Sequence, residues 1–548
     1  MGFDLGILQG YVIDGSGNPW YKADIGVEGD RIAEIGRIDP GDCERAISAE
    51  GLYVCPGFVD IHTHSDVTAI VYRGCDSTLR QGVTTHLIGN CGQSVAPMKE
   101  PYVELAKTYW GEWAGRVSEA EWSTFEEYLS ALEKGGLGHN IAALQGHGSV
   151  RTAVLGDRMD APSAAELETM KGLVAEAMEA GAFGLSTGLV YPPGCFAKTD
   201  EIVELCKIVA RYGGMYASHI RGERETILEG IKEAILIGDR AGVRVQISHN
   251  CPKWGAIGRT KETLALVSEA RKKGLDVTID NDVHTDLAPE LSGALPQYLA
   301  ALPAEERIEH LKSQENRSRI RSEIIDDKLP AFGPCGLLKH GRFDRIFVLH
   351  APTQKDLVGK NIRQIAEERG SDEFETYFDL LVEEKDGIVA IFDYISEDDV
   401  KALMKDPNMM FSSDCATWSL EGPLSDPPPY MPCSFGEYPG IFERFVRDDP
   451  VLTIQDAVRR MTSFPAQKIG LLDRGLLRPN MKADITVIDL ANIKDKATNR
   501  WPHAYPYENY PHQYPDGIPY VVVNGAVAMA EGEPTGALAG EVLRHRMS

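Results

Sequence analysis

The chain has 548 residues, more than one hydrophobic core usually supports, so we expect one large domain and a smaller one beside it. It carries 82 acidic against 56 basic residues, and this net charge of -26 disfavours nucleic acid and anionic membrane surfaces as partners. A composition of 43% hydrophobic and 25% charged residues excludes a disordered chain.

The start of the chain, MGFDLGILQGYVIDGSG, lacks the basic segment and the apolar run of a signal peptide. No later stretch approaches the roughly 18 apolar residues of a membrane helix. We therefore expect a cytoplasmic protein without a membrane span. The ten cysteines are spread along the chain without the density of a disulfide scaffold, so a buried thiol is the default expectation for each.

Short strands are predicted at both ends of the chain. Residues 4–15, 23–36 and 51–57 alternate apolar runs with turns, which is typical of a β-meander. Residues 483–490 and 519–533 have the same texture, and Asn524-Gly525 marks a hairpin turn. We expect residues 1–56 and 471–548 to form one small β-sandwich.

The middle of the chain alternates short apolar runs with helical patterns, which indicates βα units and a parallel sheet. One such pattern, residues 164–181, ends at a glycine, as helices commonly do. Eight runs predict a closed (β/α)8 TIM-like barrel over residues 57–470. The runs are 58–64, 83–91, 140–147, 182–189, 215–219, 243–249, 275–282 and 409–414.

Residues 284–408 are too many for one connection within a barrel. They contain a helical pattern of their own at 303–324 and predicted strands at 345–350 and 387–394. Long segments of this kind in compact domains are usually functional, so we predict a lid insertion over the barrel mouth. A peripheral subdomain without that role is the alternative.

Candidate metal ligands fall at the ends of the predicted barrel strands. His62 and His64 lie two apart on the first run, so both rings should project from one face, although an HxH pair alone is weak evidence. In a barrel the carboxyl ends of the strands meet at one mouth. Histidine, thiolate and carboxylate together suit zinc, so the strand ends predict a zinc site. The further candidates are Cys91, His219, His249 and Asp414.

Other histidines and Asp414 have simpler explanations. His86 is in the middle of a run and is expected to be buried and hydrogen-bonded, whereas His147 could line the mouth without binding metal. His139 and His284 are expected in loops. A lone aspartate after two serines is more often a helix N-cap, and only its position at the eighth strand favours Asp414 as a ligand.

Several motifs together resemble the amidohydrolase superfamily, specifically its D-aminoacylase (N-acyl-D-amino-acid deacylase) branch. The resemblance runs over nearly the whole chain, and GNCGxSxAP and YPPG are its more specific signals. It implies a metal-dependent amidohydrolase acting on a small-molecule linear amide. The motifs are CPGFVDIHTHSD, IGNCGQSVAP, GLSTGLVYPPG, SHIRGE, SHNC and SFPAQKIGLLDRGLLRPNMKADITVID.

The resemblance also implies residue roles. Where typical members use a carboxylated lysine on strand 4, this chain has AFGLSTGL, and the bridging role falls to Cys91. Cys91, His219 and His249 would hold the tighter zinc, and a second, weaker position would be framed by His62, His64 and Asp414. Asp414 would accept a proton from water and deliver it to the departing amine.

The substrate side departs from the family pattern. Tyr191 matches a tyrosine that the family uses at the mouth, and Lys253 is expected within reach of a polar substrate group; packing under the lid and an ordinary solvated lysine are the alternatives. A usual His-Pro-Arg run is Met431-Pro432-Cys433 here, and Tyr-Pro-Tyr is Asp282-Val283-His284. We expect a substrate without the usual carboxylate anchor, unless Lys339 or Arg342 replaces the lost arginine.

Three rival functions remain open. A cyclic amidohydrolase of the hydantoinase or dihydropyrimidinase kind shares fold and chemistry, but the missing lysine counts against it. A catalytically inactive metal-binding barrel should have lost ligands that this chain keeps. A redox protein using Cys91 is disfavoured because GNCG has no resolving cysteine nearby. Whether the protein forms a homo-oligomer is left open by the sequence.

Overall fold

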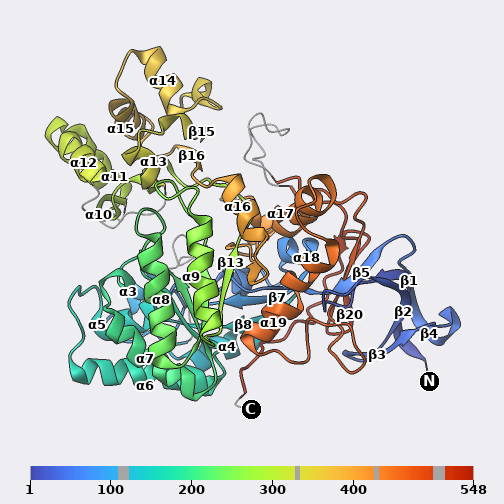
Figure 1. The fold of residues 1–548 in the computed structure, drawn as a ribbon. Helices are drawn as coiled ribbons and strands as arrows, with labels where there is room; N and C mark the ends of the chain where they lie inside the picture. The colour runs from blue at the N-terminus through green and yellow to red at the C-terminus, as the bar shows by residue number, and fades with distance from the viewer. Residues whose placement is uncertain are drawn as a thin grey trace.

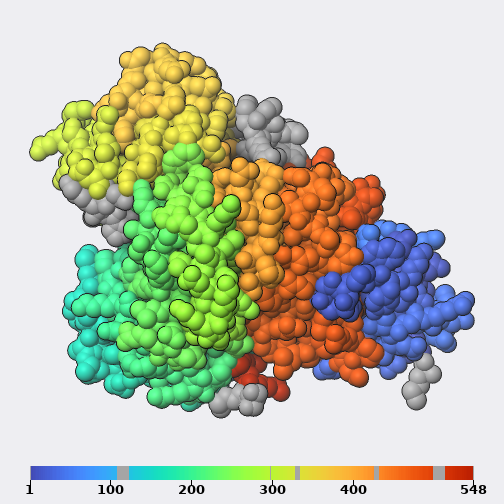
Figure 2. Space-filling model, in the orientation of Figure 1, coloured from blue at the N-terminus to red at the C-terminus, as the bar shows by residue number. Residues whose placement is uncertain are grey.

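The computed structural model describes residues 2–108, 122–300, 302–326, 334–424, 431–497 and 513–546 (Figure 1). A barrel stands at the centre, with a strand-rich body at one side and a helical insertion at one end (Figures 1 and 2). Within the described ranges, no helix combines the length and apolar character needed to cross a membrane.

Parallel strands form the barrel: seven of the eight predicted runs contain one strand each, and the run 140–147 contains two, β8 and β9. Among the described residues the barrel strands form two sheets, with the orders β6-β7-β8 and β9-β10-β11-β12-β13-β17. Leu144, between β8 and β9, links the two sheets by donating to the Ile88 carbonyl, and a parallel bridge between Thr63 and Cys415 closes the circle. The predicted barrel is confirmed. Its strands are β6 (Phe58–Asp60), β7 (Val83–Ile88), β8 (Asn140–Ala143), β9 (Gln145–Gly146), β10 (Gly184–Gly188), β11 (Met215–His219), β12 (Arg244–Ser248), β13 (Val277–Asn281) and β17 (Met409–Phe411).

Amphipathic helices surround the strands. The longest of them, α6 (Ala164–Ala180), begins at a capping box of Ser163 and Glu166 and ends at Gly181 in the left-handed conformation, as the sequence predicts. The helices bury apolar residues against the barrel, most of them in one continuous core and those of α19 in a second cluster. The others are α1 (Thr68–Val71), α2 (Asp76–Arg80), α3 (Val103–Thr108), α4 (Phe125–Glu133), α5 (His147–Leu155), α7 (Thr199–Arg211), α8 (Ile227–Ala241), α9 (Thr260–Lys272), α16 (Glu397–Met404), α17 (Cys433–Gly440), α18 (Ile454–Met461) and α19 (Ser463–Ile469).

Strands from both chain ends pair in one sheet, as predicted, through antiparallel pairing of β5 with β18. Asn524 and Gly525 form the predicted hairpin turn with positive φ. The sheet has its own core, which includes Ile7, Val54 and Ile485. The domain boundaries at 56 and 471 stay a prediction. The strands are β1 (Phe3–Val12), β2 (Tyr21–Glu28), β3 (Arg31–Gly36), β4 (Cys43–Ser48), β5 (Tyr53–Pro56), β18 (Ile485–Ile488), β19 (Tyr520–Val523), β20 (Ala526–Ala530) and β21 (Glu533–Pro534).

The predicted β-meander is correct only for β1, β2 and β3. Strands β4 and β5 pair parallel with β1, on the edge that β2 leaves free. The register of β1 shifts between Ile7 and Gly10, where Gln9 adopts positive φ. This irregularity divides the long strand, so that β4 pairs with its first half and β5 with its last two residues.

The insertion is a small α/β unit at the carboxyl-terminal end of the barrel. Its sheet has the order β14-β16-β15, and an antiparallel bridge between Lys253 and Ile395 ties it to the loop after β12. The helical pattern predicted at 303–324 breaks at Ser313 into two helices. The lid role stays a prediction. The elements are β14 (Asp286–Leu287), β15 (Ile346–His350), β16 (Val389–Asp393), α10 (Gln297–Ala300), α11 (Ala304–Lys312), α12 (Gln314–Asp326), α13 (Cys335–Lys339), α14 (Ile362–Arg369) and α15 (Glu373–Glu383).

Candidate metal centre

The six predicted ligands meet at the carboxyl ends of the barrel strands. His219 is the last residue of β11, and His249 directly follows β12, while Cys91 and Asp414 each follow their strands by three residues. His62 and His64 lie just beyond β6 rather than on it, so the prediction that they share a strand face was wrong. The segment of His62 and His64 nevertheless lies beside the segment of Asp414, because Asp414 donates its backbone N–H to the His62 carbonyl.

Cys91 stands at the centre of the cluster. Its Sγ lies 3.3 Å from His62 Nε2, 3.3 Å from His249 Nε2 and 3.6 Å from His219 Nδ1. Two of the ligand groups share this sulfur: one consists of His62, His64, Cys91 and Asp414, and the other of Cys91, His219 and His249, with ligand atoms within 4.8 Å of one another in each. One thiolate is thus within reach of two neighbouring metal positions.

The Asp414 carboxylate reaches the same cluster from the segment after β17, which pairs with the segment of His62. Its Oδ1 lies 3.1 Å from His64 Nε2 and 3.3 Å from His62 Nε2, while Oδ2 lies 3.2 Å from His249 Nδ1. About a third of the Asp414 side chain remains exposed, compared with 4% for His249. Asp414 therefore borders the open side of the cluster, where a small molecule can reach it.

Three of the candidate ligands adopt left-handed backbone conformations. Cys91, His249 and Asp414 have φ values of 50°, 47° and 53°. Such conformations cost a non-glycine residue of the order of 1 kcal/mol or more and persist only where the surrounding structure imposes them. They concentrate at functional sites in proteins, and here they aim three ligand-type side chains at one point.

Two buried carboxylates behind the histidines were not predicted. Asp280 Oδ1 lies 3.5 Å from His62 Nδ1, and Glu223 Oε1 lies 3.3 Å from His219 Nε2. Carboxylates in this position fix the orientation of a metal-binding imidazole and raise its basicity. Both residues stand in segments already singled out by the sequence, the 275–282 run and SHIRGE, but a lone acid there carries no signal of its own.

The mutual charges of the cluster shift its pKa values. Burial alone would raise the pKa of the Cys91 thiol, but His62 and His249 lower it well below its usual range. Burial would lower the pKa of His219, yet Glu223 and Cys91 raise it to about 10. For Asp414, His249 and His64 overcome the effect of burial and lower the pKa. The site therefore favours a thiolate and a carboxylate surrounded by imidazoles, a donor set that fits zinc.

The two predicted substrate residues border the cluster. Tyr191 Oη lies 3.4 Å from His219 Nδ1. Lys253 is only 3% exposed, so the alternative of an ordinary solvated lysine was wrong. Its Nζ lies 3.9 Å from Glu223 Oε1 and 5.3 Å from the ring centroid of Tyr394, which comes from the insertion. Tyr394 was not predicted, because only the fold brings the insertion to the mouth.

The four histidines for which the sequence favours other roles all contact protein groups. His86 is buried in β7, 3.1 Å from Ser65 Oγ, as predicted. His147 opens α5 and pairs with Glu201 at 2.9 Å. His139 and His284 lie outside helices and strands as predicted, but both are buried; the first contacts the His86 ring edge to face at a centroid distance of 4.2 Å, and the second lies 2.7 Å from Glu437.

The residues that depart from the family pattern, and the two cations considered as replacements for the lost arginine, all have defined surroundings in the structure. Cys433 forms a disulfide with Cys415, so the expectation of a buried thiol was wrong for this pair: the fold returns α17 to the residue after Asp414. Burial and the charge of Glu437 raise the pKa of Asp282 to about 7. Lys339 pairs with Glu225 at 2.8 Å and Arg342 with Asp344 at 2.8 Å, so each of these cations already has an acidic partner.

Comparisons with known proteins identify the family of the chain. A family model described as "Amidohydrolase family" matches residues 45–529. D-aminoacylase of Alcaligenes xylosoxydans xylosoxydans is 32% identical over 542 residues, covering 99% of this chain and 97% of that protein. The crystal structure of N-acyl-D-glutamate deacylase from Bordetella bronchiseptica, complexed with zinc and a phosphonate inhibitor, is 29% identical with a TM-score of 0.76, covering 99% and 100% of the two chains. A D-hydantoinase shares the fold, at 15% identity and a TM-score of 0.55 over 100% of this chain and 99% of its own.

Proposed function

The chain belongs to the amidohydrolase family, and we propose that the Cys91 cluster is its catalytic metal centre. The protein is a metal-dependent hydrolase acting on the C–N bond of a small-molecule linear amide. The observation that carries the proposal for the site is the position of Cys91, whose sulfur contacts three imidazole nitrogens at 3.3 to 3.6 Å.

Each candidate ligand has a proposed place. Cys91, His219 and His249 would hold the tighter zinc, and His62, His64 and Asp414, together with Cys91, would hold a second and weaker one. A bound zinc ion supplies Lewis acidity, which lowers the pKa of a water molecule and polarises an amide carbonyl. Asp280 and Glu223 orient two of the imidazoles from behind.

Asp414 is the proposed general base and acid. Its carboxylate is ionised at neutral pH because His249 and His64 lower its pKa, and it borders the open side of the cluster. It accepts a proton from the attacking water and returns that proton to the amide nitrogen, which leaves poorly unless protonated. One carboxylate thus serves both halves of the reaction.

Tyr191 and Lys253 are the proposed substrate contacts. The Tyr191 hydroxyl stands beside His219 and can donate to a substrate oxygen at the mouth. Lys253 is buried beside Glu223, whose negative charge compensates it. Asp282 adds a carboxyl group, not a cation, near Lys253, and burial together with the charge of Glu437 raises its pKa to about 7. We therefore propose a neutral or amine-bearing amide as substrate, rather than an amide with a free α-carboxylate.

The metal centre is tested by elemental analysis of the purified full-length protein, with Cys91→Ala and His249→Ala beside it. We expect one or two zinc ions per chain, with both the zinc content and amide hydrolysis lost in the two variants. Cys43→Ala, which removes a half-buried thiol from the terminal sheet, should leave both unchanged. A wild-type protein without metal after zinc reconstitution would contradict the proposal.

The substrate class is tested by turnover of acetylated amides that differ in charge. We expect kcat/KM for neutral or amine-bearing N-acetyl amides to exceed that for N-acetyl-D-methionine and N-acetyl-D-glutamate by at least about tenfold, the effect of one charged contact. Efficient hydrolysis of the two carboxylates would refute the charge argument and leave the metal centre intact. Including hydantoins and dihydropyrimidines tests the cyclic amidohydrolase alternative in the same assay.

A further inference from the structure

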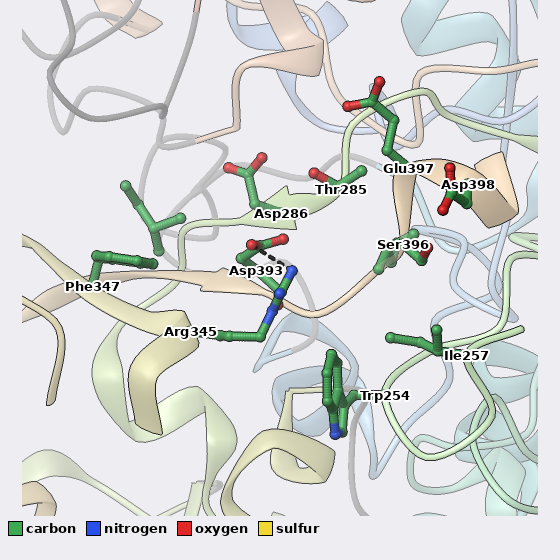
Figure 3. A pocket seen from close by; sticks show the side chains of 12 residues that line it. Trp254, Ile257, Thr285, Asp286, Arg345, Phe347, Asp393, Ser396, Glu397 and Asp398 are labelled. Carbon is green, nitrogen blue, oxygen red and sulfur yellow. Dashed lines mark hydrogen bonds and ion pairs between the residues drawn. The ribbon is translucent and has the colours of Figure 1, made fainter. Parts of the chain in front are cut away.

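A cavity of about 580 Å³ lies between the insertion and the barrel, outside the metal centre. The loop after β12 contributes Trp254 and Ile257 to its wall, and strands of the insertion contribute Phe347, Ile391 and Asp393. Figure 3 labels Trp254, Ile257, Phe347 and Asp393 among the side chains that line the cavity, with Arg345 joined to Asp393. Its volume is in the range of small-molecule sites.

One ribbon of chain separates this cavity from the metal centre. Lys253 and Ile395 form an antiparallel bridge, and the Trp254 N–H donates to the Tyr394 carbonyl at 3.0 Å. Lys253 contacts the Tyr394 ring and lies beside Glu223 of the metal centre, whereas Trp254 and Ile395 line the cavity.

The charge of the cavity is negative. Its lining contains four carboxylates and one cation, Arg345, which pairs with Asp393 at 2.6 Å. Glu397 pairs with Lys401 at 3.0 Å, outside the lining. Asp286 stands opposite Asp393 in the β14–β16 ladder and lines the cavity with a partly exposed side chain, although its Oδ2 is buried. A carboxylate at a cavity wall is a strong acceptor for a charged N–H donor.

Apolar side chains form another part of the cavity wall. Ile391 and Ile395 are buried, and Phe347, Ile257 and the half-buried Trp254 complete the apolar wall. The carboxylates and the apolar wall together suit a molecule with one positively charged end and an apolar body. A simple metal cation would use the carboxylates but leave the apolar wall in contact with water.

We propose that this cavity binds an organic ammonium ion with an aromatic or aliphatic body, its nitrogen donating to Asp286. The site is separate from the metal centre, so its occupation does not depend on the proposed hydrolysis. Because the ligand contacts both the β12 loop and the insertion, binding fastens the two together. It should therefore raise the thermal unfolding temperature of the zinc-loaded protein.

The test is isothermal titration calorimetry of the zinc-loaded full-length protein with 2-phenylethylammonium, 2-phenylethanol and 3-phenylpropionate. We expect one site for the ammonium ion, with affinity at least about tenfold above that of the alcohol, and no binding of the carboxylate. Asp286→Asn should weaken the ammonium ion by about tenfold, whereas Asp398→Asn, at an exposed position on the rim, should change it less than about threefold.

Two further measurements distinguish a loss of ligand binding from a loss of folding and from a loss of catalysis. Ile257→Arg places a tethered cation at the cavity wall and should abolish binding even if Asp286→Asn proves unstable. Removing zinc with a chelator should leave the ammonium affinity unchanged, and Asp286→Asn should hydrolyse amides as the wild type does. Equal affinity for the alcohol and the ammonium ion, or full affinity in Asp286→Asn, would overturn the proposal.

Discussion

The polar groups at the two ends of the barrel strands differ in how they are paired. At the carboxyl ends, Cys91, His249 and Asp414 adopt left-handed backbone conformations and crowd ligand-type atoms together. At the amino ends, polar side chains form complete networks: buried Arg474 pairs with Asp484 and with Asn524 Oδ1 at 2.9 Å. Asp484 and Asn524 in turn contact Asn140, the first residue of β8.

This difference places the groups suited to catalysis at one end of the barrel and the groups that stabilise the fold at the other. At the carboxyl ends, the clustered groups shift one another's pKa values and leave a donor set that fits a metal ion. At the amino ends, the network pairs its charges internally and ties the terminal segments to the barrel. In barrels of this kind the carboxyl ends carry chemistry and the amino ends carry stability. Substitutions at the first end should therefore remove activity from a folded protein, and substitutions at the second should unfold an otherwise competent one.

Asp414→Asn should give the largest effect. The amide cannot take the proton from water, so hydrolysis should fall by about 10² to 10⁴, the range for loss of a general acid–base group. Zinc held through Cys91, His219 and His249 should remain, and the unfolding temperature should stay within a few degrees of wild type. The measurements are kcat, zinc content and thermal unfolding; activity within tenfold of wild type would show that another group moves the proton.

Arg474→Met tests the opposite end. Removing one partner of a buried ion pair leaves Asp484 charged and uncompensated, which costs about 3 to 5 kcal/mol. Urea unfolding measures the loss, and kcat per folded molecule should be unchanged. Arg31→Met is the matched control, because Arg31 pairs with Asp30 at the surface with 45% of its side chain exposed, and it should cost less than about 1 kcal/mol.

A small loss in Arg474→Met, or a loss of kcat in the folded fraction, would break the comparison. The first result would mean that the amino-end network contributes little net stability. The second would mean that the two ends are coupled through the strands between them.

Local sequence was sufficient for the barrel and for the candidate ligands. Buried parallel strands are short apolar runs, and their carboxyl ends converge wherever the barrel closes, so Cys91, His219 and His249 could be placed from strand positions alone. The same reasoning located Lys253, which follows His249 in the loop after its strand. Burial of that lysine could not be foreseen, because it depends on Tyr394 from the distant insertion.

The sequence did not predict contacts between distant segments that contain no recognisable motif. Asp280 and Glu223 are single acids whose function depends on the histidine in front of them. The Cys415–Cys433 disulfide and the parallel pairing of β4 with β1 likewise need the fold first. A lone residue acquires such a role only when tertiary structure supplies its partner.

Lys468 gives the smallest and most specific test of the amino end. Its Nζ lies 2.9 Å from Asp276 Oδ1, beside the start of β13, and only 2% of the side chain is exposed. Burial lowers the pKa of Lys468 from 10.5 to about 8, although Asp276 opposes the change. Between these two pH values the unfolded chain binds more protons than the folded one, so this residue makes stability rise with pH.

Comparison with Lys468→Met isolates that effect, because all other titrating groups are common to both proteins. The unfolding free energy of the wild type minus that of the variant should increase by roughly 2 kcal/mol between pH 7.5 and 10, because each tenfold difference in proton affinity between the folded and unfolded chains corresponds to about 1.4 kcal/mol. Urea unfolding at several pH values measures this difference. A difference that stays flat or falls with pH would show that Lys468 is not destabilised by burial, and that the amino end compensates its charges more completely than we infer.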